Sequence, residues 1–405
     1  MRRFRETIAD LRQWNRDFTL LAVAVFAMGG FFGVTLTLFN NFIVERLSIE
    51  AHELGLVEAL REVPGFLNVG FVALVVFLPG ALVGAVCLLA MGLGIGAYGW
   101  IDSVTTLALL SLVWSLGFHC WVPFEQNLAL TFSPPGAKGR WLGQLRSVNS
   151  IAWLMMIGAC ILLLPHIGYR GMFIFASILT GAGGVALLFA RRDRAHEKAR
   201  RIVVKRRYGL YYALNFLQGC RKQMFITFAI FALVKVHGMP VQVTMWLVLI
   251  NQALITFTAP LMGRLIDRHG ERSMLSLSYG ILFFVFLGYA VVVNRPALYV
   301  LYCIDNLVFF GGIALTTYLH RICPAEELTP TLAMGVTMNH VAAVLAPLLG
   351  GLAWHYFGYR VIFFSGAVLA LISLIVTQRM APHVSEETSD ESEPSPLPLE
   401  ESLPD

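Results

Sequence analysis

The chain has 405 residues, of which 57% are hydrophobic and 14% are charged, and its formal net charge is +5. Soluble domains average roughly 45–50% apolar and about 25% charged residues, so this composition excludes an ordinary soluble protein and indicates one that lies in lipid. In such a protein the useful information is where the charges fall, because their distribution sets the orientation in the membrane.

Twelve mainly apolar windows follow one another along the chain, and each is long enough for a membrane-spanning helix of about 20 residues. The first follows a basic start, as in a signal peptide, but it continues without a small-residue cleavage site, so we expect it to be retained. The first six windows are 18–44, 54–78, 80–100, 104–124, 142–164 and 171–190. The second six are 208–236, 241–262, 274–293, 297–319, 332–354 and 361–377.

The connecting segments divide the chain and orient it. Most of the 30 Lys and Arg residues lie on the side that holds both ends, which predicts cytoplasmic termini and an integral multi-pass protein, in the bacterial inner (plasma) membrane. We predict a cytoplasmic segment at 1–17, a six-helix bundle at 18–190, a basic cytoplasmic linker at 191–207, a second bundle at 208–380 and an acidic tail at 381–405. The composition of the tail predicts disorder.

The two halves look duplicated at an offset of 190 residues. The triplet at 168–170, Gly-Tyr-Arg, recurs at 358–360. The same offset, with no gap, pairs Gly29 with Gly219, Val44 with Val234, Gly80 with Gly270, Pro134 with Pro324, Leu142 with Leu332 and Asn149 with Asn339. Duplicated six-helix halves predict an all-α membrane protein of two pseudo-symmetric bundles.

One charged segment after the eighth window resembles a known family. It reads GRLIDRHGER over 263–272 and is similar to the G-x-L-x-D-R-x-G-x-R loop of the major facilitator superfamily, with Gly263, Asp267, Arg268, Gly270 and Arg272 in its motif positions. The resemblance implies a twelve-helix transporter in which this cytoplasmic loop latches neighbouring helix ends in one state of the transport cycle. The corresponding segment of the first half, 73–82, keeps only the glycine that matches Gly270, so a symmetric pair of latches is not expected.

The superfamily resemblance also implies that the first, fourth, seventh and tenth helices line a central cavity, and charges there are functional candidates because each costs about 2.5–3.5 kcal/mol in the bilayer centre. The seventh window carries Gln218, Arg221 and Lys222, and the tenth carries Asp305 and Asn306. We expect a cation to bind substrate or to take part in coupling, and Asp305 to be a candidate proton carrier. The alternative is a fixed ion pair between a cation of the seventh helix and either Asp305 or Glu125, a carboxylate on the fourth helix.

Further ionisable residues lie on the second, fourth and eleventh windows. His119 and Glu125 are additional candidates on the fourth, where Glu125 sits at the predicted helix end. Glu58, Arg61 and Glu62 are three and four residues apart, so we interpret them as mainly structural membrane ion pairs. A metal site joining Cys220, His340, His119 and Asp305 has no local ligand spacing, and no metal or other cofactor is predicted.

These features together predict a monomeric secondary active transporter that moves a small solute by alternating access. We favour coupling to a proton gradient and a polar or anionic organic substrate. The protein is expected to lie in the lipid bilayer. The alternatives are efflux of amphipathic drugs or of a metal ion, and a transporter-like sensor or scaffold. No nucleic-acid partner is expected, and the chain has neither a phosphate-binding loop nor a nucleophile elbow that would indicate an enzyme.

Overall fold

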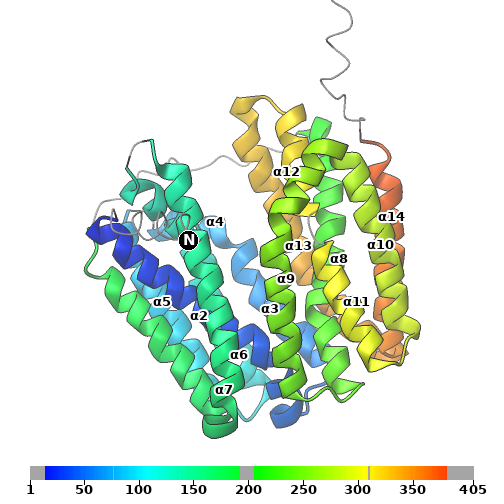
Figure 1. The fold of residues 1–405 in the computed structure, drawn as a ribbon, viewed down its shortest axis with the longest axis horizontal. Coiled ribbons are helices and arrows are strands. Elements are labelled where there is room, and N and C mark those ends of the chain that lie inside the picture. Colours follow the sequence, from blue (N-terminus) through cyan, green and yellow to red (C-terminus); the bar gives the residue numbers. More distant parts are fainter. Residues whose placement is uncertain (1–13, 76, 135, 192–204, 309–310, 381–405) are drawn as a thin grey trace, which may run out of the picture.

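The computed structural model describes residues 14–75, 77–134, 136–191, 205–308 and 311–380. These residues form helices joined by short turns, with no β-strand among them, which confirms the predicted all-α fold class (Figure 1). Most of the predicted amino-terminal segment, nearly all of the basic linker and the acidic tail lie outside the described residues.

The helices follow the predicted windows in order. The first half contains α2 (Arg16–Leu47), α3 (Ala51–Phe66), α4 (Asn68–Val75), α5 (Gly80–Gly96), the short 3-10 helix η1 (Ala97–Trp100), α6 (Val104–Phe132) and α7 (Lys138–Leu187). The second half contains η2 (Arg206–Tyr208), α8 (Gly209–Lys235), α9 (Val241–His269), α10 (Glu271–Val291), α11 (Arg295–Leu307), α12 (Gly311–Ile322), α13 (Ala325–Phe357) and α14 (Tyr359–Thr377). Within the described ranges, nine helical stretches are long and apolar enough to cross a membrane.

Several helices differ from the predicted windows in extent. The fifth and sixth windows share α7, which turns at Gly168, where φ is 63° and the helical backbone is interrupted. The fourth helix, α6, continues to Phe132, beyond the predicted end at 124. Likewise α9 reaches His269, so most of the segment predicted as a charged loop is helical and turns only at Gly270, where φ is 76°. Polar residues end an apolar window without ending the hydrogen bonds of the helix, and a positive φ is readily adopted by glycine.

The duplication is visible in the packing of equivalent helices. In the first half, a Cβ on Gly29 of α2 would lie 2.5 Å from the carbonyl oxygen of Asn149 on α7. In the second half, a Cβ on Gly219 of α8 would lie 3.2 Å from the Cα of Asn339 on α13. Each glycine therefore lets its helix approach an asparagine of its own half. The two glycines are related by the offset of 190, and so are the two asparagines.

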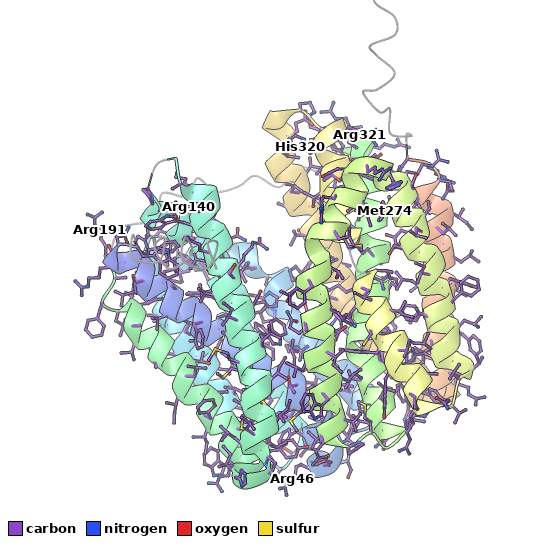
Figure 2. The ribbon with its side chains drawn as sticks, in the orientation of Figure 1. Arg46, Arg140, Arg191, Met274, His320 and Arg321 are labelled. Carbon is purple, nitrogen blue, oxygen red and sulfur yellow. The ribbon has the colours of Figure 1, made fainter. Side chains whose placement is uncertain are left out.

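The two halves lie side by side and pack through α3 against α13 and through α7 against α9 (Figure 1). Figure 2 shows Arg140, Arg191, His320 and Arg321 at one end of the molecule, here called the terminal side, and Arg46 at the other, the opposite side. The helices of the two halves diverge toward the terminal side in Figure 1.

Contacts between the halves are close on the opposite side. The backbones of α3 and α13 approach so tightly that a Cβ on Gly55 would lie 2.3 Å from the carbonyl oxygen of Pro347. Asn41 Nδ2 donates to the carbonyl oxygen of Met239 at 3.0 Å. Lys235 Nζ lies 2.8 Å from the carboxylate of Glu50 and donates to the carbonyl oxygen of Ile49 at 2.9 Å. The opposite side is therefore held together by backbone packing and by polar contacts.

Candidate functional site

A buried ion pair occupies the second half. Arg221 on α8 places Nη1 3.2 Å from Oδ1 of Asp305 on α11, and their side chains are 2% and 5% exposed. Gln218, one turn before Arg221, is also buried, and its Oε1 has no hydrogen-bond partner among the described residues. Asn306 donates to the carbonyl oxygen of Tyr302 on its own helix at 2.9 Å. Two of the predicted candidates, Arg221 and Asp305, are thus brought together as partners.

A second ion pair lies on α3, as the spacing of its charges predicts. Arg61 donates to Glu58 one turn earlier, and both residues are buried. The guanidinium carbon of Arg61 lies 5.2 Å from the centroid of the Trp114 ring, which adds a cation–π contact. The pair is neutralised locally, so it fixes α3 against α6 rather than presenting a charge to a ligand.

A third group of ionisable residues joins the two halves near the middle of the helices, and we call Glu62, His119, Lys222 and His340 the midplane cluster. Glu62 on α3 lies 3.3 Å from Nδ1 of His340 on α13. The rings of His119 on α6 and His340 are 5.2 Å apart at their centroids. The charges of Lys222 and Glu62 attract one another, and Lys222 is partly buried. The cluster therefore draws one residue from each of four helices and two from each half.

The small residue Gly65 permits this arrangement. A Cβ there would lie 2.5 Å from Cε1 of His340 and 2.6 Å from Cε1 of His119, so the two rings close over the glycine. The sequence did not reveal the Glu62–His340 contact, because the partners are 278 residues apart and belong to different halves. The available signal was that the second and eleventh windows each carry ionisable residues.

The motif that resembles the superfamily loop lies on the terminal side. Asp267 and Arg268 are exposed on the last turns of α9. Beyond the Gly270 turn, Arg272 donates through Nη2 to Oε1 of Gln378 at 3.2 Å, just after α14. Gly263 lies within α9. Arg272 thus ties the start of α10 to the end of α14 within the second half.

The remaining candidate, Glu125, lines a cavity of about 390 Å³ on the terminal side of the first half. The residue is not at a helix end, because α6 continues for two more turns, and its side chain is partly buried. Arg146 and Asn149 on α7 line the same cavity. His119 is not among its lining residues and belongs to the midplane cluster instead.

The four residues of the metal interpretation are not brought together. His119 and His340 are neighbours, whereas Asp305 pairs with Arg221. Within the part of the chain that the structure describes, no three His, Cys, Asp or Glu side chains gather to hold a metal ion, and the six cysteines are free.

Comparisons with known proteins agree with this architecture. The structure superimposes on a crystal structure of a point variant of the nucleoside transporter NupG with a TM-score of 0.77 at 13% identity, covering 90% of this chain and 100% of that one. A bacterial homologue of the human lysosomal transporter Spinster, in an inward-facing and unoccupied conformation, gives a TM-score of 0.70 at 13% identity, covering 90% and 97%. The occupied form of that homologue gives 0.68 at 15% identity, covering 94% and 99%. No curated protein matches the sequence.

The fold is that of polytopic membrane transport proteins and, with the family match that follows, it indicates a transporter rather than an enzyme. The family model of the Major Facilitator Superfamily matches residues 211–403. The chain is similar to this superfamily over its second half, without assignment to a subfamily, and this similarity together with the fold supports a secondary transporter.

Proposed function

We propose that the protein is a proton-coupled secondary transporter that moves a small polar or anionic solute by alternating access. We place it, with cytoplasmic termini, in a bacterial inner membrane as a monomer. The observation that carries the coupling is the Glu62–His340 contact, a carboxylate and an imidazole 3.3 Å apart that belong to different halves.

A proton changes the strength of this contact. When His340 is protonated and Glu62 is ionised, the two attract one another strongly, because charges interact more strongly in a poorly solvated interior than in water. Loss of the proton from His340, or its gain by Glu62, removes that attraction. Because α3 and α13 carry these residues and pack across the halves, the change favours separation of the halves on the opposite side.

The arrangement of contacts supports an inward-facing state in this scheme. The halves meet on the opposite side through Gly55, Asn41 and Lys235, and diverge toward the terminal side. With cytoplasmic termini, the terminal side faces the cytoplasm. The similar Spinster homologue is described in an inward-facing conformation.

Two cations on α8 favour a polar or anionic solute, but they differ in their surroundings. Arg221 is fully buried against Asp305, whereas Lys222 is more accessible and lies within the field of Glu62. Lys222 is therefore the better candidate for contact with a solute. Asp305 is a second candidate for carrying a proton, because protonation would release Arg221.

Transport in proteoliposomes tests the proposal. Purified protein is reconstituted with a pH-sensitive dye inside, and amino acids, nucleosides and organic acids are added one at a time across an imposed proton gradient. At least one solute should drive dye-reported proton flux. Absence of flux with every solute class would favour the sensor or scaffold alternative, and solute accumulation without proton flux would reject coupling.

Variants then locate the coupling residues. His340→Gln and Glu62→Gln should each reduce gradient-driven accumulation about tenfold or more while leaving solute exchange measurable, because exchange does not require net proton movement. If Asp305 carries the proton, Asp305→Asn should remove the pH dependence of transport. Unchanged proton coupling in this variant would exclude Asp305 as the proton carrier. Arg140→Gln, an exposed change on the terminal side, serves as the control.

A further inference from the structure

The cavity of about 390 Å³ in the first half is built by continuous faces of three helices. Its size falls within the roughly 300–1,000 Å³ of typical small-molecule sites. The residues that line it are Met28 and Phe32 of α2, Phe118, Val122, Glu125, Gln126 and Ala129 of α6, and Leu142, Leu145, Arg146, Asn149, Ser150 and Trp153 of α7. On α6 and on α7 they recur three or four residues apart, as expected for one helix face.

One part of the lining is aromatic. The rings of Phe32 and Trp153 are 6.0 Å apart at their centroids and inclined by 24°, so they are nearly parallel. Phe118 meets Phe32 edge to face at 5.0 Å. Aromatic pairs of this geometry stabilise flat rings by contacts between π-systems as well as by burial of apolar area. This part of the cavity fits an aromatic ring.

The other part of the lining carries opposite charges that remain separate. Glu125 and Arg146 act on one another electrostatically, but the described side chains show no direct ion pair between them. Arg221 and Asp305, in contrast, are in contact and almost fully buried. Gln126, Asn149 and Ser150 add neutral hydrogen-bonding groups beside the charges. A solute with one positive and one negative group could meet both charges at once.

We propose that this cavity binds a zwitterionic solute that carries an aromatic ring. Its cationic group pairs with Glu125, its anionic group pairs with Arg146, and its ring lies against Phe32, Phe118 and Trp153. The identification of this solute as the transported substrate rests on the proposed function. Binding itself does not, because it can be measured without a membrane gradient.

A purely apolar ligand is the main competitor, since six of the thirteen lining residues have hydrocarbon side chains, and Met28 and Trp153 add two more that are mainly apolar. That ligand would leave Glu125 and Arg146 facing each other across an apolar molecule. Arg146 is exposed and Glu125 is partly buried, so an apolar ligand placed over them would displace their water without supplying a partner, which is unfavourable. The charges therefore favour a zwitterion over a hydrocarbon of the same shape.

A series of four probes that share one ring separates these contributions. L-Tryptophan is the zwitterion, tryptamine the cation, indole-3-acetate the anion and indole the neutral ring. Binding to the purified full-length protein is measured by thermal shift and by equilibrium dialysis at neutral pH. We expect tryptophan to bind about tenfold more tightly than either singly charged probe, since hydrogen bonds to charged groups contribute more than neutral ones.

Two variants assign the charges. Glu125→Gln should lower the affinity for tryptophan and tryptamine about tenfold and leave that for indole-3-acetate nearly unchanged. Arg146→Gln should do the reverse, lowering the affinity for tryptophan and indole-3-acetate while sparing tryptamine. Arg140→Gln, six residues earlier on α7 and outside the cavity, should bind all four as the native protein does.

The outcomes distinguish this proposal from the proposed function. Equal binding of all four probes, no detectable binding of tryptophan, or the same loss in both charge variants for every probe would overturn the zwitterion site. If tryptophan binds in the expected pattern but no solute drives proton flux in proteoliposomes, the site stands and proton-coupled transport is rejected.

Discussion

At the residue scale, the Arg221–Asp305 pair shows how a charged residue in the second half is accommodated. Both side chains are almost completely buried, and their attraction must offset the loss of water around the guanidinium and around the carboxylate. Pairs of this kind are strongly destabilised when one partner is removed, whereas replacement of both partners by apolar residues is often tolerated.

We therefore expect Arg221→Met and Asp305→Leu each to destabilise the protein by about 3–5 kcal/mol, because each removes one partner of a buried ion pair. The double variant should regain more than half of that loss. Melting temperatures of the purified proteins in the same detergent measure the effect. Additive losses in the double variant would show that the pair is not an energetic unit.

Glu327 provides a titratable contact outside the apolar stretch of α13. Its carboxylate accepts from Arg207 and, at 2.7 Å, from Lys205 Nζ, so it connects the start of the second half to α13. The hydrogen bonds from Arg207 and then Lys205 lower the pKa of Glu327 from 4.5 to about 2. A carboxylate with a lowered native pKa stabilises the fold most above its unfolded pKa.

The stabilisation by Glu327 should consequently be complete above about pH 4.5 and disappear as the pH falls toward about 2. Glu327→Gln should lower the melting temperature slightly at neutral pH, and the difference from the native protein should shrink in that acidic range. Melting curves in detergent from pH 7 to pH 2.5 test this. A difference that stays constant with pH would show that the carboxylate charge is not responsible.

At the element scale, the crossing of α3 and α13 depends on two glycines. A Cβ on Gly55 would lie 2.3 Å from the carbonyl oxygen of Pro347, and one on Gly351 would lie 2.5 Å from that of Ala51. The contacts are with backbone atoms, which cannot move aside as the end of a flexible side chain can. Any side chain at these positions must push the two helices apart.

Gly55→Val should therefore open the opposite side and reduce transport about tenfold or more. Accessibility to a water-soluble thiol reagent, measured at a cysteine placed at His52 with the native cysteines replaced by alanine, should rise. Gly158→Val on α7 is the matched control, because a Cβ there meets no atom within 4 Å. Unchanged labelling in the Gly55 variant would show that the helices already separate in the resting protein.

The sequence predicted the helices well because hydropathy depends on local composition. The 190-residue offset gave a second sign, since it relates the windows of one half to those of the other. It predicted their ends poorly at α6 and α9, where the apolar window stops just before the charged residues Glu125 and Arg264 while the helix continues. The Arg221–Asp305 pair was among the alternatives because both residues lie in apolar windows. The Glu62–His340 contact was not, since these two residues meet only through the packing of α3 on α13, which the sequence does not show.

At the scale of the whole molecule, the close contacts between halves lie on the opposite side, while the Glu125 cavity lies toward the terminal side. The rings of His52 on α3 and His355 on α13 are 4.4 Å apart, which places the two helices in register near this surface. Alternating access requires that these two positions separate during each cycle.

A reversible cross-link tests whether they do. The six native cysteines are first replaced by alanine, and His52→Cys and His355→Cys are then introduced. A short thiol-reactive cross-linker that contains a cleavable disulfide joins the two new cysteines. The cross-linked protein should retain less than about a tenth of its transport, because the opposite side cannot open, and reduction should restore it. Tryptophan binding should persist in the cross-linked form, since the cavity lies on the terminal side.

Each single-cysteine variant treated with the same reagent is the control for chemical modification. Full transport by the cross-linked double variant would mean that α3 and α13 stay together throughout the cycle. In that case a rigid α3–α13 contact would have to act as a pivot, and the Glu62–His340 contact within it could not report the separation of the halves. The same experiment therefore tests the motion and the location of its proton-sensitive contact.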